Sequence, residues 1–179
     1  STPRVAPKAN PKAAAKEAPP PAVASTAQTA TSSPGQITSF EPLGDWRRGD
    51  EPNGTLQQST AEVFDGAMAA RLDYDFPAEA GSKNYVVFLA QAPLRIPDDA
   101  SGLQLQVFGD GSGHFLNAWV VDNGGQVWQY TFGQIQHTGW APMTASLAPS
   151  SEWPNGPVGD VGSDGLKPPL RLKALVLDG

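Results

Sequence analysis

Short stretches rich in Val, Leu, Phe, Tyr and Trp recur from Ile37 to the end of the chain, and turn residues separate them. No stretch spaces apolar residues by three and four positions over about eleven residues, so the pattern predicts strands and not helices. About nine strands in about 140 residues predict an all-β fold: a two-sheet antiparallel β-sandwich of the jelly-roll type, with an open barrel as the alternative. The expected strands span residues 37–41, 56–61, 68–76, 85–90, 103–108, 115–121, 127–132, 144–147 and 170–177.

Aromatic and amide side chains alternate along residues 115–121 and 127–132, which a turn at 122–125 joins as a hairpin. Trp and Tyr rings stack on the apolar face of a pyranose, and amide, carboxylate and guanidinium groups bond its hydroxyls. If the strand at 103–108 lies beside this hairpin, one sheet face presents a sugar-binding surface. The predicted stacking residues are Trp119, Trp128 and Tyr130; the predicted hydrogen-bonding residues are Gln104, Gln106 and Asn117, with Arg71 and Asp73 as second-rank candidates.

Two alternatives stand beside this interpretation. In the first alternative, Trp119 or Trp128 is a core tryptophan of the sandwich and does not contact a ligand. The whole domain also has a second possible role, as a structural or protein-interaction domain that packs against a neighbouring domain. In that case exposed aromatic residues form a protein interface, and the candidates are Trp46, Trp140 and Trp153.

The first 35 residues differ in composition from the rest of the chain. They consist mainly of Ala, Pro, Thr, Ser and Lys, contain no aromatic residue, and have Val5 and Val23 as their only large aliphatic residues. Such a segment cannot bury enough apolar surface to offset the entropy of ordering. We therefore predict a disordered Pro/Ala/Thr-rich linker over residues 1–35 and a folded binding module over residues 36–179.

The charge differs between the same two parts. The linker carries a net charge of +3 and the whole chain −6, so residues 36–179 carry −9. A domain of this charge repels a phosphate backbone and anionic lipid, and we expect neither nucleic acid nor a membrane as its partner. The chain has no cysteine, which excludes disulfides and thiolate metal sites.

A glycosidase needs two carboxylates on opposite sides of a cleft. Asp73 and Asp75 lie on one face of one predicted strand, and Asp98 and Asp99 adjoin in a turn. Neither pair flanks a sugar from two sides, so we expect no enzymatic activity.

Several blocks of the folded part carry a resemblance to a known family. They are Gly109-Asp110-Gly111-Ser112-Gly113-His114, Asp122-Asn123-Gly124-Gly125-Gln126-Val127-Trp128, Phe132-Gly133-Gln134-Ile135 and Thr138-Gly139-Trp140. Together they resemble galactose-binding-like jelly-roll carbohydrate-binding modules, and are similar to the accessory module of bacterial phosphodiester glycosidase-type proteins. The resemblance covers residues 37–179. It implies a β-sandwich, non-catalytic binding of a polysaccharide or oligosaccharide, an extracellular or cell-surface location, and a catalytic or surface domain tethered through the linker; we expect a monomer.

The resemblance also implies a structural calcium ion that ties the first strand region to the last strand. The residues that match are Glu41, Asp65 and Asp178. Carboxylates and loop carbonyls are the ligands that calcium prefers. The alternative is that these three residues are ordinary surface acids.

Overall fold

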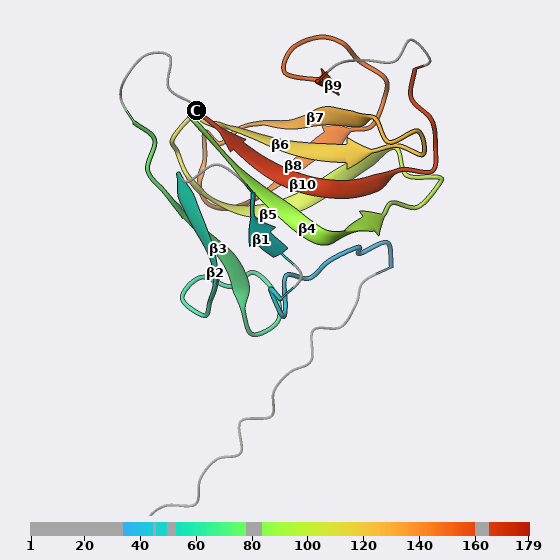
Figure 1. The fold of residues 1–179 in the computed structure, drawn as a ribbon. Helices are drawn as coiled ribbons and strands as arrows, with labels where there is room; N and C mark the ends of the chain where they lie inside the picture. Colours follow the sequence, from blue (N-terminus) through green and yellow to red (C-terminus); the bar gives the residue numbers. More distant parts are fainter. Residues whose placement is uncertain (1–33, 45, 50–52, 78–83, 160–164) are drawn as a thin grey trace, which may run out of the picture.

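The computed structural model describes residues 34–44, 46–49, 53–77, 84–159 and 165–179. These residues form an all-β structure with no helix (Figure 1). In the described part of the chain there is thus no helix of a length and hydropathy suited to crossing a membrane. The predicted linker lies outside the described residues except for Pro34 and Gly35.

One layer of the fold is a six-stranded sheet in which all neighbouring strands are antiparallel. The first described strand, β1, and the short strand β9 form its two edges, and the C-terminal strand β10 lies near its centre. The strand order is β1 (Trp46–Arg48), β4 (Tyr85–Arg95), β10 (Arg171–Asp178), β6 (Phe115–Val121), β7 (Val127–Gln134) and β9 (Gly156–Val158).

The second layer consists of two separate antiparallel pairs. One pair is β2 (Gly54–Ser59) with β3 (Ala69–Tyr74), and the other is β5 (Gly102–Asp110) with β8 (Thr138–Ser146). Because β2 contacts β1 and β8 contacts β7, the two pairs approach the six-stranded sheet from its opposite edges. The resulting fold is β-sandwich-like. The second layer is divided into two pairs, and β3 and β5 are the strands on either side of the gap between them.

The core lies between the layers. Side chains alternate along the strands of the six-stranded sheet, so every second residue faces inward, as the two-residue period of a strand requires; an irregularity between Leu172 and Ala174 shifts this alternation by one residue in β10. Each large apolar side chain buried there contributes about 1.5–3 kcal/mol relative to exposure. The inward residues of this sheet include Val86, Phe88, Leu116, Ala118, Val120, Tyr130, Phe132, Leu172 and Leu177, and the second layer adds Met143 and Ala145.

The all-β prediction is confirmed, but several strands differ from the expected ones; β4, for example, continues to Arg95 instead of ending at residue 90. Residues 37–41 are not a strand, because Phe40 has a φ of 57° and Ser39 Oγ accepts a hydrogen bond from the Glu41 N–H, so the chain turns there. The three-residue edge strands β1 and β9 were not expected. Strand β8 begins at Thr138 instead of residue 144, since it pairs with β5 along its whole length.

Candidate functional site

A cleft of about 1000 Å³ opens between β3 and β5. Within the described residues, β3 pairs only with β2, and β5 pairs only with β8, so no ladder closes this gap. The floor of the cleft includes side chains from the inner face of the six-stranded sheet, among them Phe88, Leu116 and Leu177. The gap between β3 and β5 in the second layer therefore extends from the protein surface to the core.

An aromatic wall stands on the β5 side of the cleft. Phe108 of β5 and Trp140 of β8 are directly paired, and their ring centroids lie 5.5 Å apart in an edge-on arrangement. Phe64, in the segment between β2 and β3, packs on Trp140 at 5.5 Å. Phe64 is 55% exposed and Phe108 is 47% exposed. Large apolar rings that stay this exposed at the mouth of a cleft are typical of a ligand-binding surface.

The close approach of β5 to the residues before β8 aligns this wall. Gly109 is buried, and a Cβ at that position would collide with the backbone oxygen of His137. Only glycine permits this approach. Phe108 directly precedes Gly109. The pairing of Phe108 with Trp140 therefore depends on glycine at position 109.

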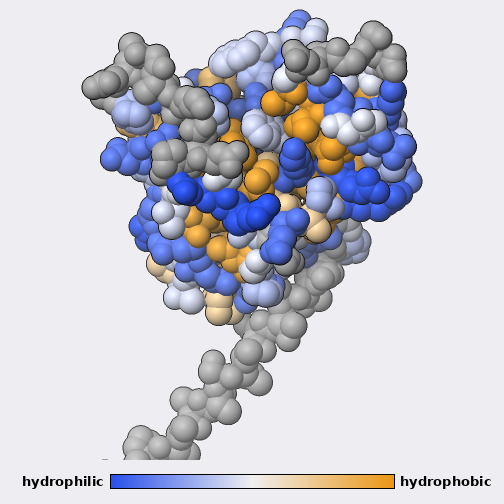
Figure 2. Space-filling model, in the orientation of Figure 1, coloured by the Kyte–Doolittle hydropathy of each residue, from blue (hydrophilic) through white to orange (hydrophobic). Residues whose placement is uncertain are grey.

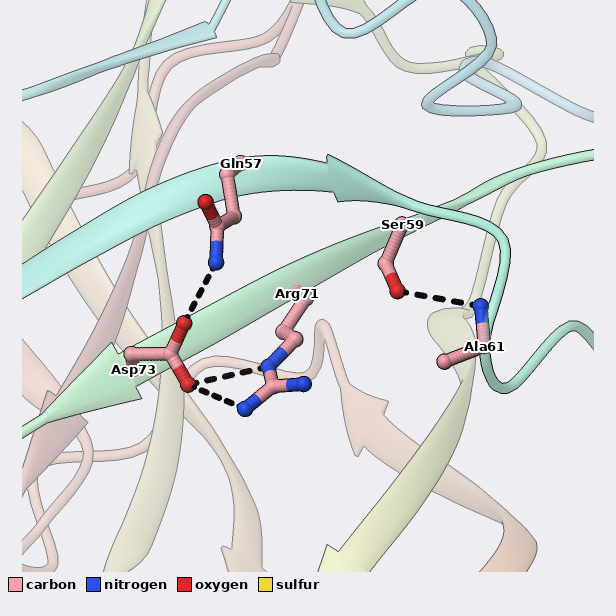
Figure 3. Close-up of polar contacts among 5 residues, drawn as sticks. All are labelled: Gln57, Ser59, Ala61, Arg71 and Asp73. Atoms are coloured by element: carbon pink, nitrogen blue, oxygen red, sulfur yellow. Dashed lines mark hydrogen bonds and ion pairs between the residues drawn. The ribbon is translucent and has the colours of Figure 1, made fainter.

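A polar network faces the cleft from β3. Asp73 accepts hydrogen bonds from Gln57 Nε2 at 2.6 Å and from Arg71 Nε and Nη2 at 2.9 and 2.7 Å (Figure 3). Both oxygens of the carboxylate are thereby engaged. The side chains are held in one arrangement, which reduces the entropy that a ligand would have to overcome.

Two amides of β5 complete the polar lining. Gln104 is exposed, and Gln106 is half-buried, directly opposite Pro142 of β8. The Oε1 atom of Gln106 is buried without a hydrogen-bond partner. A buried acceptor without a donor is uncommon in folded proteins and is expected to gain one when a polar ligand binds.

The cleft is closed at one end by a side-chain contact between β3 and β5. Tyr74 Oη donates a hydrogen bond to Asp110 Oδ2 at 2.5 Å, and the Ser112 N–H donates to the other oxygen at 2.9 Å. Burial disfavours the charged form of Asp110, but the hydrogen bonds from Tyr74 and Ser112 outweigh it and hold the pKa of Asp110 below 3.8. Burial, followed by the bond to Asp110, raises the pKa of Tyr74 above 10.0.

This contact gives a stability prediction. We expect Tyr74→Phe to lower the free energy of unfolding by about 1 kcal/mol at neutral pH, because it removes a hydrogen bond to an ionised group near the surface. The loss should shrink as the pH falls below 3.8, where Asp110 is protonated first in the unfolded chain and then in the folded protein. Urea unfolding of Tyr74→Phe, Asp110→Asn and the double variant tests the bond. Fully additive single effects would show that the two groups do not interact.

The structure divides the predicted ligand residues into three groups. Gln104, Gln106, Arg71 and Asp73 all line the cleft. Trp128 and Tyr130 face the core: Tyr130 is only 2% exposed, and Trp128 Nε1 donates to the buried carboxylate of Asp122 at 3.1 Å. Trp119 and Asn117 lie on the opposite face of the six-stranded sheet.

The expectation that these residues share one sheet face is therefore wrong. Trp119 pairs with Gln129, while Trp128 pairs with Val120, so the two tryptophans point to opposite sides of the sheet. Residue spacing along each strand gave the correct face within that strand. Which residues of two neighbouring strands share a face depends on the register in which the strands pair. A shift of one residue in that register moves every side chain of one strand to the other face.

The outer face of the six-stranded sheet has its own polar contacts. Trp119 Nε1 donates to Gln129 Oε1 at 2.9 Å, and Gln129 Nε2 donates to the Pro154 carbonyl at 2.7 Å. Asn117 is fully buried, and neither atom of its amide has a hydrogen-bond partner. A ligand would reach Asn117 only after the surrounding side chains moved.

Figure 2, seen from the side of β4, β6 and β10, shows hydrophobic patches among hydrophilic side chains.

The three carboxylates predicted to hold calcium are not brought into one group. Glu41 accepts a hydrogen bond from the Ala67 N–H at 3.2 Å, which places it beside the loop of Asp65 at the cleft. Asp178 ends β10, opposite Tyr85 and Phe115. In the described ranges, no three His, Cys, Asp or Glu side chains are arranged to hold a metal ion. The residues do not fit the implied ion as one set, and calcium binding stays a prediction.

Several residues of the cleft were not predicted as ligand residues. Phe64, Phe108 and Tyr74 were absent from the set, and Trp140 appeared only as an interface candidate. Alternation placed Phe108 on the face of Gln104 and Gln106, which is the one signal that pointed to it. The contact of Phe64 with Trp140 joins residues far apart in the sequence, and no local pattern indicates it.

Comparison of the chain with protein-family models and with curated proteins found no match. The function is therefore inferred from the site.

Proposed function

We propose that the protein is a non-catalytic carbohydrate-binding module, a jelly-roll β-sandwich at the cell surface or outside the cell, whose glycan lies in the cleft between β3 and β5. The observation that carries the proposal is the aromatic wall formed by half-buried Trp140 and the exposed rings of Phe64 and Phe108, beside a fixed polar network. The sequence resemblance to carbohydrate-binding modules agrees with it.

The two sides of the cleft suit the two kinds of surface on a sugar, its apolar ring face and its hydroxyl groups. The apolar face of a pyranose ring removes apolar surface from water when it stacks on Trp140 or Phe108, and the rings lose little freedom because they already contact each other. The hydroxyl groups meet donors on Arg71 and acceptors on Asp73 from the other side. A purely apolar ligand would leave these polar groups without partners, which costs free energy.

Two of the carboxylates that line the cleft, those of Asp73 and Asp110, are already held by hydrogen bonds. Asp73 is engaged by Gln57 and Arg71, and Asp110 by Tyr74 and Ser112. Carboxylates held in this way orient a ligand and are poorly placed to transfer a proton to it. We therefore assign the cleft to binding.

The site is tested by locating the bound glycan on the full chain. Affinity electrophoresis through a panel of polysaccharides identifies a ligand, and hydrogen–deuterium exchange with that ligand maps its position. We expect amides of β3, β5 and the segment 60–68 to exchange several-fold more slowly in the complex, because the ligand covers them. Amides of β7 and β9, which contribute no residue to the cleft lining, should be unchanged and serve as the internal control. Protection confined to the outer face around Trp119 would move the site there, and no retention on any glycan would overturn the proposal.

A second candidate function is docking of a tethered neighbouring domain on the outer face of the six-stranded sheet. Trp153 favours it, because this residue is 75% exposed and its ring packs edge-on against Phe115 at 5.1 Å. Trp153 does not line the cleft. The two functions thus use different surfaces and are separated by the same exchange experiment, carried out with the neighbouring domain present.

A further inference from the structure

Asn117 is a polar side chain that is buried on the outer face of the six-stranded sheet without a hydrogen-bond partner. It is 0% exposed, and neither its Nδ2 nor its Oδ1 forms a hydrogen bond in the part of the chain that the structure describes. Burial of an amide in this state costs free energy, because the same group is fully hydrogen-bonded in water. Any motion that lets water reach Asn117 therefore recovers part of that cost.

A short strap of chain, residues 153–155, lies on the outer face of the sheet and leads into the edge strand β9. The ring of Trp153 packs edge-on against Phe115 at 5.1 Å. The carbonyl of the next residue, Pro154, accepts a hydrogen bond from Gln129 Nε2 at 2.7 Å. The Oδ1 atom of Asn155 accepts one from the Thr131 N–H at 2.9 Å. Each residue of the strap thus contacts a different residue of β6 or β7.

The residues that the strap contacts surround Asn117. Phe115 precedes Asn117 by two positions on β6 and therefore lies on the same face. Thr131 is the register partner of Asn117 in β7, and Gln129 is the register partner of Trp119, the next outward residue of β6. The strap is therefore anchored on two sides of Asn117, and it lies over the part of the sheet where this amide is buried.

The strap is held more weakly than the sheet beneath it. Within the described ranges, its ring contacts and hydrogen bonds to β6 and β7 side chains and to the Thr131 N–H are the three given above. Trp153 is 75% exposed, and residues 148, 149, 151 and 152 before it are exposed as well. Segments with few buried contacts open locally at a much lower free energy than the whole fold.

We propose that the strap is a lid over Asn117, closed in this structure, which opens locally because opening gives the buried amide water as a hydrogen-bond partner. The contacts of the strap favour the closed form, and hydration of Asn117 favours the open form. The lid carries Trp153, so its opening also removes the ring that favours docking of a neighbouring domain on this face. The lid is independent of the proposed glycan site, because none of residues 153–155 lines the cleft.

Hydrogen exchange followed by NMR on the full chain measures this opening at one amide. The N–H of Thr131 is bonded to Asn155 Oδ1, so its protection reports contact with the strap. We expect its exchange rate to be nearly independent of urea below the unfolding transition, since a local opening exposes little surface. Amides of β10 should instead exchange with a steep dependence on urea. An equally steep dependence at Thr131 would overturn the proposal.

The variant Asn117→Leu tests the cause of the opening. Leucine is similar in size to asparagine and needs no hydrogen-bond partner, so opening no longer gains the hydration of an amide. We expect exchange at Thr131 to become about tenfold slower. If the variant is more stable towards urea but exchange at Thr131 is unchanged, opening of the strap does not expose position 117, and the lid is refuted.

The variant Trp153→Ala keeps the test decisive even if Asn117→Leu does not fold. It removes the ring contact with Phe115 from an exposed position, and we expect exchange at Thr131 to become several-fold faster. The matched control is Phe64→Ala, which removes an exposed ring with one ring contact, to Trp140, away from the strap. Unchanged exchange in Trp153→Ala, or an equal acceleration in Phe64→Ala, would contradict the lid.

Discussion

Replacing Asp122 by alanine is expected to lower the free energy of unfolding by about 4 kcal/mol, because one buried carboxylate satisfies four donors. Asp122 is 3% exposed. Its Oδ1 accepts from the Gly124 and Gln126 N–H groups at 2.8 and 3.0 Å, and its Oδ2 accepts from Trp128 Nε1 and the Lys167 N–H, each at 3.1 Å. Alanine leaves these donors without an acceptor.

The position of Asp122 explains why the effect extends beyond one turn. It closes the β6–β7 hairpin and, through Lys167, holds the segment that leads into β10. Strands β6 and β10 are neighbours and contribute Leu116 and Leu177 to the floor of the cleft. Loss of Asp122 is therefore expected to loosen the sheet on which the cleft is built.

The pH dependence identifies the charge as the cause. Burial opposes ionisation of Asp122, but the hydrogen bonds from Trp128, Lys167, Gln126 and Gly124 outweigh it and hold its pKa below 3.8. As the pH falls, the unfolded chain takes up the proton near 3.8 and the folded protein only below that value. The advantage of wild type over the variant should thus be complete near neutral pH and disappear in strong acid.

Chemical denaturation of three variants measures this effect. Asp122→Asn keeps the shape, loses the charge, and is expected to cost about half as much as Asp122→Ala, so it reports on the site even if the alanine variant does not fold. Asp99→Ala, an exposed residue of a turn, serves as the control and should lie within about 0.5 kcal/mol of wild type. A cost below about 1 kcal/mol for Asp122→Ala would contradict the role assigned to this carboxylate.

Trp140→Ala is expected to weaken glycan binding about thirtyfold, or about 2 kcal/mol, because it removes the central ring of the aromatic wall. Trp140 contacts both Phe64 and Phe108 at 5.5 Å, so its loss also frees the two rings beside it. The measurement is the dissociation constant from affinity electrophoresis in the polysaccharide that retains wild type best. Trp140→Phe should restore part of the affinity, since a smaller ring still stacks.

Trp153→Ala is the matched control for this prediction. The residue is also a tryptophan and is more exposed, but it lies against Phe115 outside the cleft lining. We expect its removal to leave glycan affinity within about twofold of wild type. If Trp153→Ala abolishes retention and Trp140→Ala does not, the binding surface lies on the other side of the molecule.

Half of the ligand set predicted from the sequence lies in the cleft. Gln104 and Gln106 were found through alternation in one strand, and Arg71 and Asp73 through alternation in another. These four residues come from strands that are not hydrogen-bonded to each other, so only the arrangement of the second layer shows that they face one space. The predicted aromatic residues lie elsewhere: Trp128 and Tyr130 face the core, because an aromatic residue in a strand serves the core as readily as a ligand, and Trp119 lies on the outer face of the six-stranded sheet.

The sequence by itself determined the all-β class and most of the strands, because the two-residue period and the turn residues act over short distances along the chain. It also determined the face of Gln104, Gln106 and Phe108 within their own strand. Only the tertiary structure decided that β3 and β5 stay apart, that Phe64 reaches Trp140, and that Trp119 and Trp128 point in opposite directions. These features depend on register and on contacts between distant segments, and the local pattern of the chain carries no information about either.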